Sequence, residues 1–144
     1  MEQRIVEFIE GQTVATVCCV DGNNRPYCFS CFYALDKDRH ILYFKSSSGT
    51  HHSALLNTNN AVAGTIQPDK LNKLAIQGIQ FSGTILLPGD TALAHAKSSY
   101  YLKYPFALTM SGELYGVQLE TIKMTDNTLA FGKKLKWELS AETV

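Results

Sequence analysis

The fold is decided by residues 13–45, whose sequence is TVATVCCVDGNNRPYCFSCFYALDKDRHILYFK. Residues 13–20 are almost wholly apolar, which is typical of a strand buried on both faces. The polar cluster at 21–24 predicts a turn, and Pro26 marks the start of a second strand that runs to about Leu35. A second polar connection at 36–39 leads into a third strand over residues 40–45. The stretch therefore predicts a meander of three strands.

Beyond this meander the chain alternates short strands with short helices. Further strands are expected at 61–67, 76–87 and 114–124, with a closing hairpin from 129–131 and 135–139. Helices are expected at 3–10, from the loop at 46–50 through Asn57, and at 90–104. Gly78 and Gly83 are candidate bulges. No repeat or linker divides the chain, so we expect one β-barrel domain with helical decoration over residues 1–144.

Composition excludes several function classes. The 144 residues are 45% hydrophobic and carry 13 basic and 13 acidic side chains, a formal net charge of zero. A non-specific nucleic-acid binder needs surplus positive charge to neutralise phosphates, so this class is not expected. No apolar run is long enough to span a membrane, and the segment after Met1 lacks the pattern of a signal peptide. We therefore expect a cytoplasmic protein, and the low net charge is compatible with a homo-oligomer.

Four cysteines lie in the first two predicted strands: Cys18, Cys19, Cys28 and Cys31. The spacing of Cys28 and Cys31 also occurs in zinc and redox motifs, but those motifs need a turn or a helix start. In a strand, residues three apart point to opposite faces. We therefore expect buried, reduced thiols and no metal site.

The sequence lacks the common motifs by which side chains carry out catalysis. It contains no P-loop, no nucleophile-elbow serine and no dinucleotide-binding glycine pattern. Adjacent histidines such as His51 and His52 cannot lie on one helix face to share a metal. If the protein is an enzyme, a cofactor is expected to carry the chemistry, and no catalytic residue is assigned.

The segment from Phe44 to His52 is the most informative one for function. A strand ends, a Ser/Gly-rich loop follows, and a helix begins with hydroxyl and imidazole donors. Free N–H groups at a helix N-terminus favour an anion, and Ser and Thr hydroxyls add donors. The alternative interpretation is a capped helix with exposed histidines.

The order of these features resembles the pyridoxamine 5'-phosphate oxidase-like, FMN-binding split β-barrel superfamily, and within it the YhbP-like branch. The resemblance covers nearly the whole chain. It is carried by the apolar first strand, the Asp21-Gly22 turn, the strand after Pro26, the Ser/Thr loop and helix, and the blocks 61–65, 78–83, 104–107 and 125–134. It implies a mainly β fold, a six-stranded antiparallel split barrel with a few short helices.

The resemblance also implies where FMN would bind, in a cleft between the two subunits of a homodimer. The phosphate motif of the family falls on Thr50, His51 and His52. The stretch that faces the phosphate and ribityl chain matches Phe44, Lys45 and Ser46, and the strand along the flavin ring matches Ser30, Cys31, Phe32 and Tyr33.

Two departures from the family pattern bear on function. Phe29 and Ala34 stand where oxidases of the superfamily have an Arg and a Lys on the second strand. His51 and His52 stand where oxidases of the superfamily have Arg-Lys, and His is charged only below a pKa of about 6.5. Lys133 and Lys134 are our candidates to supply the missing positive charge, the alternative being a solvated hairpin end. These departures leave pyridoxine-phosphate oxidation unassigned.

Four functions remain open from the sequence. The first is an FMN-dependent oxidoreductase that acts on an unknown small molecule or on a reduced nicotinamide. The second is a flavin-binding module or redox sensor without turnover. The third is a haem-binding split barrel with His51, His52 or His95 as axial ligand. The fourth is a dimer whose flavin site has decayed.

Overall fold

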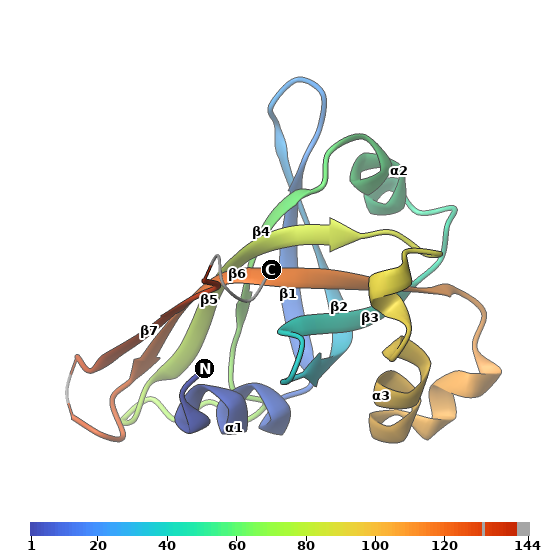
Figure 1. The fold of residues 1–144 in the computed structure, drawn as a ribbon. Helices are drawn as coiled ribbons and strands as arrows, with labels where there is room; N and C mark the ends of the chain where they lie inside the picture. The colour runs from blue at the N-terminus through green and yellow to red at the C-terminus, as the bar shows by residue number, and fades with distance from the viewer. Residues whose placement is uncertain (131, 141–144) are drawn as a thin grey trace.

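The computed structural model describes residues 1–130 and 132–140 and contains a seven-stranded antiparallel sheet (Figure 1). The strands are β1 (Val14–Val20), β2 (Pro26–Asp36), β3 (Ile41–Ser46), β4 (Ala61–Ile66), β5 (Gln77–Leu86), β6 (Glu113–Asp126) and β7 (Lys134–Glu138). The helices are α1 (Gln3–Gly11), α2 (His51–Thr58) and α3 (Ala96–Lys103), with 3-10 segments η1 (Thr91–Leu93) and η2 (Pro105–Thr109). No helix in the described ranges is long and apolar enough to cross a bilayer.

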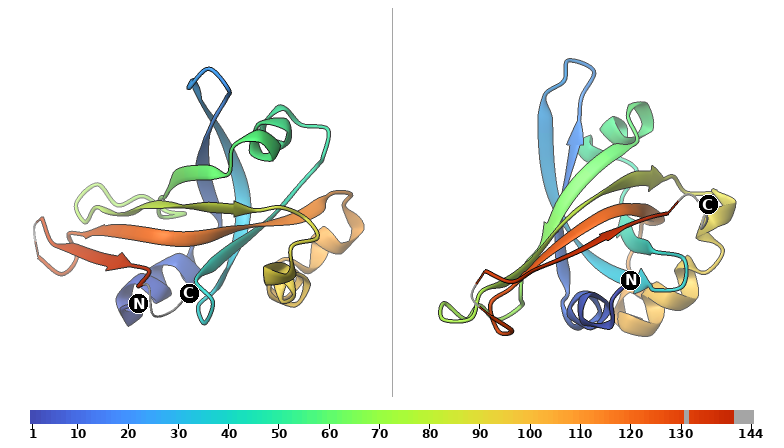
Figure 2. Two further views of the ribbon diagram at one scale, coloured as in Figure 1. Left: turned by 45° about the horizontal axis from the view of Figure 1, so that its top comes forward. Right: turned by 60° about the vertical axis from the view of Figure 1, so that its left-hand side comes forward.

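The strands close into a barrel because β3 pairs at both of its edges. The order along the sheet is β3-β2-β1-β4-β5-β6-β7, and an additional pairing joins β3 to β6. Six strands therefore form a closed antiparallel ring, and β7 extends the sheet beyond β6 (Figures 1 and 2). The predicted fold class, a mainly β six-stranded antiparallel barrel with short helices, is confirmed.

Alternation along the strands divides the chain between a core and an outer face. Inward residues such as Val17, Phe44 and Leu119 are buried in the barrel, and α1 covers one end with Ile5 and Ile9. A second, smaller apolar cluster lies outside the barrel wall, where α3 packs against β2 and β3. Its buried members are Ala34, Ile41, Tyr43, Ala96, Tyr100, Tyr104 and Ala107.

One predicted glycine bulge is confirmed and the other is not. The pairing of β5 with β6 shifts register between Ser82 and Gly83, whereas Gly78 pairs regularly with Thr125. A Cβ atom at Gly83 would lie 2.3 Å from the carbonyl oxygen of Gln118. Only glycine allows the two backbones to approach this closely at the bulge.

Two predicted elements differ in detail. The helix expected at 90–104 begins only at Ala96, because the Asp90 side chain accepts a hydrogen bond from the N–H of Ala92 and caps a short 3-10 turn first. The closing hairpin forms between β6 and β7, so that residues 129–130 lie in its turn and not in a strand. Phe131, which was expected in this hairpin, lies outside the described residues.

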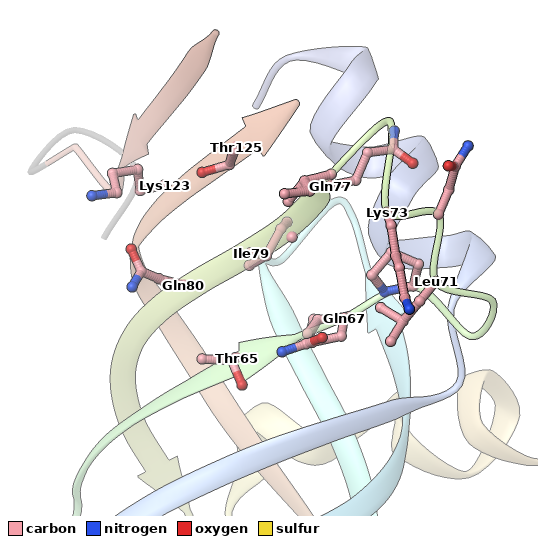
Figure 3. Close-up of a pocket in the computed structure, with 14 residues that line it drawn as sticks. Thr65, Gln67, Leu71, Lys73, Gln77, Ile79, Gln80, Lys123 and Thr125 are labelled. Atoms are coloured by element: carbon pink, nitrogen blue, oxygen red, sulfur yellow. The ribbon is translucent and has the colours of Figure 1, made fainter. Parts of the chain in front are cut away.

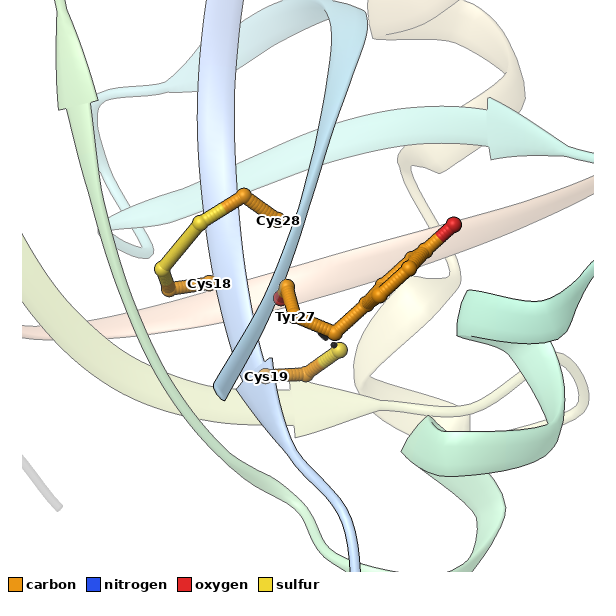
Figure 4. The surroundings of a disulfide bond; sticks show 4 residues. All are labelled: Cys18, Cys19, Tyr27 and Cys28. Carbon is orange, nitrogen blue, oxygen red and sulfur yellow. Dashed lines mark hydrogen bonds between the residues drawn. A yellow bond between two sulfur atoms is a disulfide. The ribbon is translucent and has the colours of Figure 1, made fainter. Parts of the chain in front are cut away.

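The expectation of four buried, reduced thiols is wrong for two of them. Cys18 and Cys28 are directly opposite on β1 and β2 and form a disulfide across the outer face of the hairpin (Figure 4). Cys19 and Cys31 are free and point inward, and Cys19 donates a hydrogen bond to the carbonyl of Tyr27. Burial in the barrel wall raises the pKa of the Cys31 thiol to about 12, so this thiol is unreactive.

Candidate functional site

The junction of β3 and α2 has the predicted strand, loop and helix. Thr50 is the N-cap of α2, and its hydroxyl accepts a hydrogen bond from the N–H of Ser53. The same hydroxyl lies 3.0 Å from the carbonyl of Ser47, and the Ser53 hydroxyl donates to that carbonyl at 2.8 Å. The Thr50 side chain is therefore engaged in capping, which favours the capped-helix interpretation for this one residue.

The two histidines each contact an aromatic ring on β2. The Nε2 atom of His52 lies 2.6 Å from the hydroxyl oxygen of Ser46, and its ring stacks on Phe29 with the centroids 3.9 Å apart. The His51 ring meets Tyr27 edge-on at 4.8 Å. The end of β3, the first turn of α2 and the hairpin of β1 and β2 thus converge on one pair of imidazoles.

His52 is neutral at pH 7 in this arrangement. Burial disfavours the imidazolium, and the neighbouring His51 disfavours it further, so the pKa of His52 is lowered from its usual value. A neutral imidazole can donate only one N–H, and its second nitrogen accepts. The first turn of α2 therefore gains no fixed positive charge from His52 at neutral pH.

Hydrogen-bond donors remain available at this helix N-terminus. In the described chain, the backbone N–H groups of His51 and His52 have no partner, as is usual for the first residues of a helix. The exposed hydroxyls of Ser47 and Ser48 also make no hydrogen bond with the described residues. These groups suit an anion through neutral donors and the helix dipole.

Two residues expected at the phosphate end are used elsewhere. The Lys45 ammonium donates to the carbonyls of Ala107 and Met110, at 2.8 and 2.5 Å, and so secures the segment η2. The Phe44 side chain is buried in the barrel core and stacks on Tyr115. Of the three predicted residues at the end of β3, only Ser46 has its side chain at the α2 junction.

The side chains of the strand predicted to bind the flavin ring point to two opposite faces of the sheet. Ser30 and Phe32 are exposed on the outer face of β2, while Cys31 points into the barrel wall. Phe32 is 43% exposed and stacks on Tyr104 with the centroids 5.4 Å apart. An exposed aromatic side chain beside an open strand could cover a planar ligand.

Lys133 and Lys134 lie on the opposite side of the folded molecule from α2. Lys133 lies in the turn between β6 and β7, and Lys134 is the first residue of β7; this hairpin end projects from the barrel away from α2 (Figures 1 and 2). The Lys134 ammonium donates to the hydroxyl of Thr125 at 3.1 Å, and Lys133 is exposed. The chain therefore does not bring these lysines together with its own histidines.

A cavity of about 500 Å³ opens at this lysine-bearing end, between the loop that joins β4 to β5 and the strands β5 and β6 (Figure 3). Its lining includes Lys73 and Lys123 and no carboxylate, and neither ammonium is paired within the described chain. Sequence reasoning missed both lysines. The alternation of β6 places Lys123 and Thr125 on one face and was a usable signal, whereas the position of Lys73 depends on an irregular loop.

Sequence reasoning also missed a cation on the α2 side. Arg25 precedes β2, and its carbonyl accepts a hydrogen bond from the N–H of Asp21 at 2.9 Å, so the ladder of the hairpin extends to it. It lies two residues before Tyr27, the ring that meets His51. Alternation along the hairpin places Arg25 on the same face as Tyr27 and was the signal that could have found it.

The residues at the start of α2 supply the hydrogen-bond donors that the phosphate of FMN needs, but they supply little positive charge. Two backbone N–H groups, two serine hydroxyls and the pair of Ser46 and His52 surround the start of α2. No lysine ammonium of this chain is hydrogen-bonded to that turn among the described residues, since Lys45 is directed to η2. A bound phosphate would be held mainly by neutral donors unless Arg25 or cations from another chain reach it.

The fold defines the class of protein. Solved structures with this barrel include a heme binding protein from Mycobacterium smegmatis (TM-score 0.74, 13% identity, 91% of this chain and 55% of that one). They also include HutZ, a heme storage protein from Vibrio cholerae (TM-score 0.65, 14% identity, 83% and 89%), and an FAD-binding protein from Mesorhizobium loti (TM-score 0.66, 14% identity, 86% and 94%). At these identities the likeness shows the fold alone, that of the flavin- and haem-binding split barrels.

The chain belongs to the UPF0306 protein family. A UPF0306 protein from Yersinia pseudotuberculosis is 40% identical over 134 residues, which cover 92% of this chain and 90% of that relative. A second, from Serratia proteamaculans, is 34% identical over 137 residues and 94% of both chains. No family model matches the sequence.

Proposed function

We propose that this protein binds FMN, with the phosphate at the N-terminus of α2 and the ring system along the open part of β2. The observation that carries the proposal is the 2.6 Å hydrogen bond between Ser46 and His52. It fixes an imidazole at the start of a helix whose first two N–H groups are free within the described chain. Donors, helix dipole and the aromatic rings of Tyr27 and Phe29 together suit a phosphorylated planar ligand.

We further propose that the site is completed in a homodimer. The α2 end has the donors and little charge, while the opposite end has Lys73, Lys123, Lys133 and Lys134. One chain cannot place both sets around one phosphate, because they lie on opposite sides of the barrel (Figure 1). Two chains arranged so that the lysines of one approach α2 of the other would supply the cations that the histidines lack.

FMN, when bound, supplies reversible two-electron redox chemistry. The chain would hold the phosphate through α2 and orient the ring against β2. On this basis we propose an oxidoreductase that acts on a small molecule, with a reduced nicotinamide as candidate reductant. The alternative is a flavin-binding module without turnover.

The test is a titration of the purified protein with FMN, riboflavin and FAD, followed by flavin fluorescence. We expect FMN to bind at least tenfold more tightly than riboflavin, because only FMN carries the terminal phosphate. The variant Ser46→Ala should reduce this preference, while Ser99→Ala on α3 serves as the matched control. Equal affinity for FMN and riboflavin would contradict a phosphate site at α2.

Turnover is tested separately from binding. Protein loaded with FMN is mixed anaerobically with NADH or NADPH, and the flavin absorbance is followed. Reduction within seconds supports the oxidoreductase, and an unchanged spectrum over minutes supports the module.

Haem is the second candidate ligand, and one observation favours it. The His51 imidazole is exposed and makes no hydrogen bond within the described chain, so a ring nitrogen is available as an axial ligand. His52 is less suitable because Ser46 occupies its Nε2. A sharp Soret band on titration with hemin, lost in His51→Ala but kept in His95→Ala, would support haem over flavin.

A further inference from the structure

We propose that Cys18 and Cys28 form a reversible thiol–disulfide site, which accepts electrons from a dithiol reductant and controls the order of the hairpin that faces α2. The two residues are directly opposite on β1 and β2, with their Cα atoms 4.3 Å apart. This spacing identifies a non-hydrogen-bonded pair, in which opposite side chains are closest. The pair can therefore form and break its bond without a large movement of the backbone.

The position of the bond is where the hairpin leaves the barrel. The pairing of β1 with β4 ends at Cys18, and the pairing of β2 with β3 begins only at Tyr33. Residues 19–27 therefore form a two-stranded ribbon, which projects beyond the barrel (Figure 1). An isolated two-stranded ribbon is marginally stable in water, so a covalent bond at its base has a large effect on its order.

The ribbon and its base carry the aromatic wall of the α2 site. Tyr27 and Phe29 flank Cys28 in sequence and point to the other face of β2, where they meet His51 and His52. A bond at Cys28 fixes the position of both rings. Loss of the bond would loosen Tyr27 most, because it lies on the ribbon side of the disulfide.

A reductant can reach this bond. Cys28 is exposed on the outer face of the hairpin, and Cys19 lies on the other face of β1 (Figure 4). Cys31 also points inward, so neither free thiol can exchange with the pair. Exposed disulfides are the labile ones in proteins. The chemistry thus points to a small dithiol, or a protein dithiol, as reaction partner.

The exchange balances in two steps. A thiolate of the reductant attacks Sγ of Cys28, the bond to Sγ of Cys18 breaks, and Cys18 leaves as a thiolate that takes up a proton. The second thiol of the reductant then displaces Cys28 and forms the disulfide of the oxidised reductant. Two electrons and two protons pass from the dithiol to the protein.

The test compares hydrogen exchange of the oxidised protein with that of protein treated with dithiothreitol. We expect amides of residues 19–27 to exchange on the order of tenfold faster after reduction, because a closed loop with a sequence separation of 10 is opened. The double variant Cys18→Ser/Cys28→Ser should match the reduced protein with or without dithiothreitol. The control Cys31→Ala, which keeps the pair, should respond as the wild type does.

Mass spectrometry after alkylation supplies the second measurement. When alkylated in denaturant, so that the buried thiols can react, protein oxidised with diamide should carry two alkylated cysteines, Cys19 and Cys31, and reduced protein four. Four alkylated cysteines after diamide, or equal exchange of residues 19–27 in both states, would overturn the inference.

The effect on ligand binding rests on the proposed function, and the two can be separated. If reduction speeds exchange in the ribbon but FMN binds in neither state, the redox site stands and the flavin proposal fails. If FMN binds equally in both states and the ribbon does not respond, the redox site fails and the flavin proposal stands. We expect both to hold, with several-fold weaker FMN binding after reduction.

Discussion

The two ends of the barrel differ in the groups that they offer to an anion. The α2 end has a helix N-terminus, hydroxyls and stacked rings, but its half-buried His52 has a lowered pKa, which favours the neutral imidazole. The end formed by β6, β7 and the cavity has several lysines, and the helix that begins beside it, α1, directs Arg4 of its first turn to Asp126 and Thr128. The α2 end therefore offers hydrogen-bond donors with little positive charge, whereas the other end offers positive charge from lysines. We infer that neither end alone is a complete anion site.

The two ends are also anchored differently. At the lysine end, Asp126 is fully buried and receives hydrogen bonds from Arg4, Gln77 and Thr128. At the α2 end, the corresponding anchors are hydroxyl groups, chiefly Thr50 and Ser53. Loss of a buried carboxylate network costs more than loss of a hydroxyl cap, so substitution of Asp126 should destabilise the protein more than substitution of Thr50.

The largest expected effect tests this anchoring. Asp126→Ala should lower the free energy of unfolding by about 3 kcal/mol, because it leaves Arg4 and the N–H of Thr128 without their acceptor. Urea unfolding at pH 7 measures the loss. Asp38→Ala is the control, because Asp38 is exposed in the turn between β2 and β3. It should change the free energy of unfolding by less than about 0.5 kcal/mol.

Acid should weaken the same anchor. Burial alone would raise the pKa of the Asp126 carboxyl, but hydrogen bonds from Thr128 and Arg4 outweigh burial and hold the pKa below its usual value. The carboxylate therefore contributes stability above pH 4, and this contribution is lost as the pH falls through the lowered pKa. Asp126→Asn should be less sensitive to acid over this range than the wild type.

The next effect tests whether the two ends meet across a dimer. Lys133→Ala/Lys134→Ala should weaken FMN binding by about 10- to 100-fold, as expected for two lost charge-assisted hydrogen bonds. Riboflavin binding should not change, because riboflavin has no phosphate. Lys37→Ala/Lys97→Ala removes the same charge from the β2–β3 turn and from α3, and serves as the control. An unchanged FMN affinity in the first variant would place the phosphate away from these lysines.

A smaller effect tests the cap of α2. Thr50→Ala should lower the free energy of unfolding by about 1 kcal/mol, the usual cost of a lost N-cap. Thr50→Ser should restore most of this stability, because the hydroxyl can again accept from the N–H of Ser53. Thermal unfolding of the three proteins provides the measurement, and equal melting temperatures would show that the loop holds α2 without the cap.

The smallest effect concerns pH at the α2 end. Because the pKa of His52 is lowered, FMN affinity should change little as the pH falls from 8 to 7 and should rise only in more acidic solution, where the imidazole takes up a proton beside the phosphate. His52→Gln should remove the part of this rise in FMN affinity that comes from protonation of His52. Fluorescence titrations at fixed ionic strength measure it, and a steep change between pH 7 and 8 would argue against a neutral His52.

Local chemistry predicts some of this molecule well. Alternation and turn residues in 13–45 predicted the first three strands, and Ser/Thr chemistry predicted the start of α2 near Thr50. The pairing of Cys18 with Cys28 was within reach, since both are equally far from the centre of the turn at Asn23. It was missed because the cysteines were judged by motif and not by register.

Other features depend on contacts between distant segments. Lys45 is directed to the carbonyls of Ala107 and Met110, more than sixty residues away, and no local pattern encodes that choice. The burial that lowers the pKa of His52 likewise arises where the β1–β2 hairpin meets α2. Side-chain roles at the site therefore followed from tertiary packing, while the backbone followed from the sequence.

The strand β7 has a further consequence, for the behaviour of concentrated solutions. Among the described residues it pairs with β6 alone, so its other side is an open strand edge within that part of the chain, and such an edge could recruit a strand from another molecule. Lys134, Lys136 and Glu138 alternate along this exposed edge and oppose such contact by charge and hydration. Replacing them with neutral residues should therefore favour fibrous or amorphous precipitation, so that Lys134, one of the lysines proposed to meet an anion, also helps to keep the protein in solution.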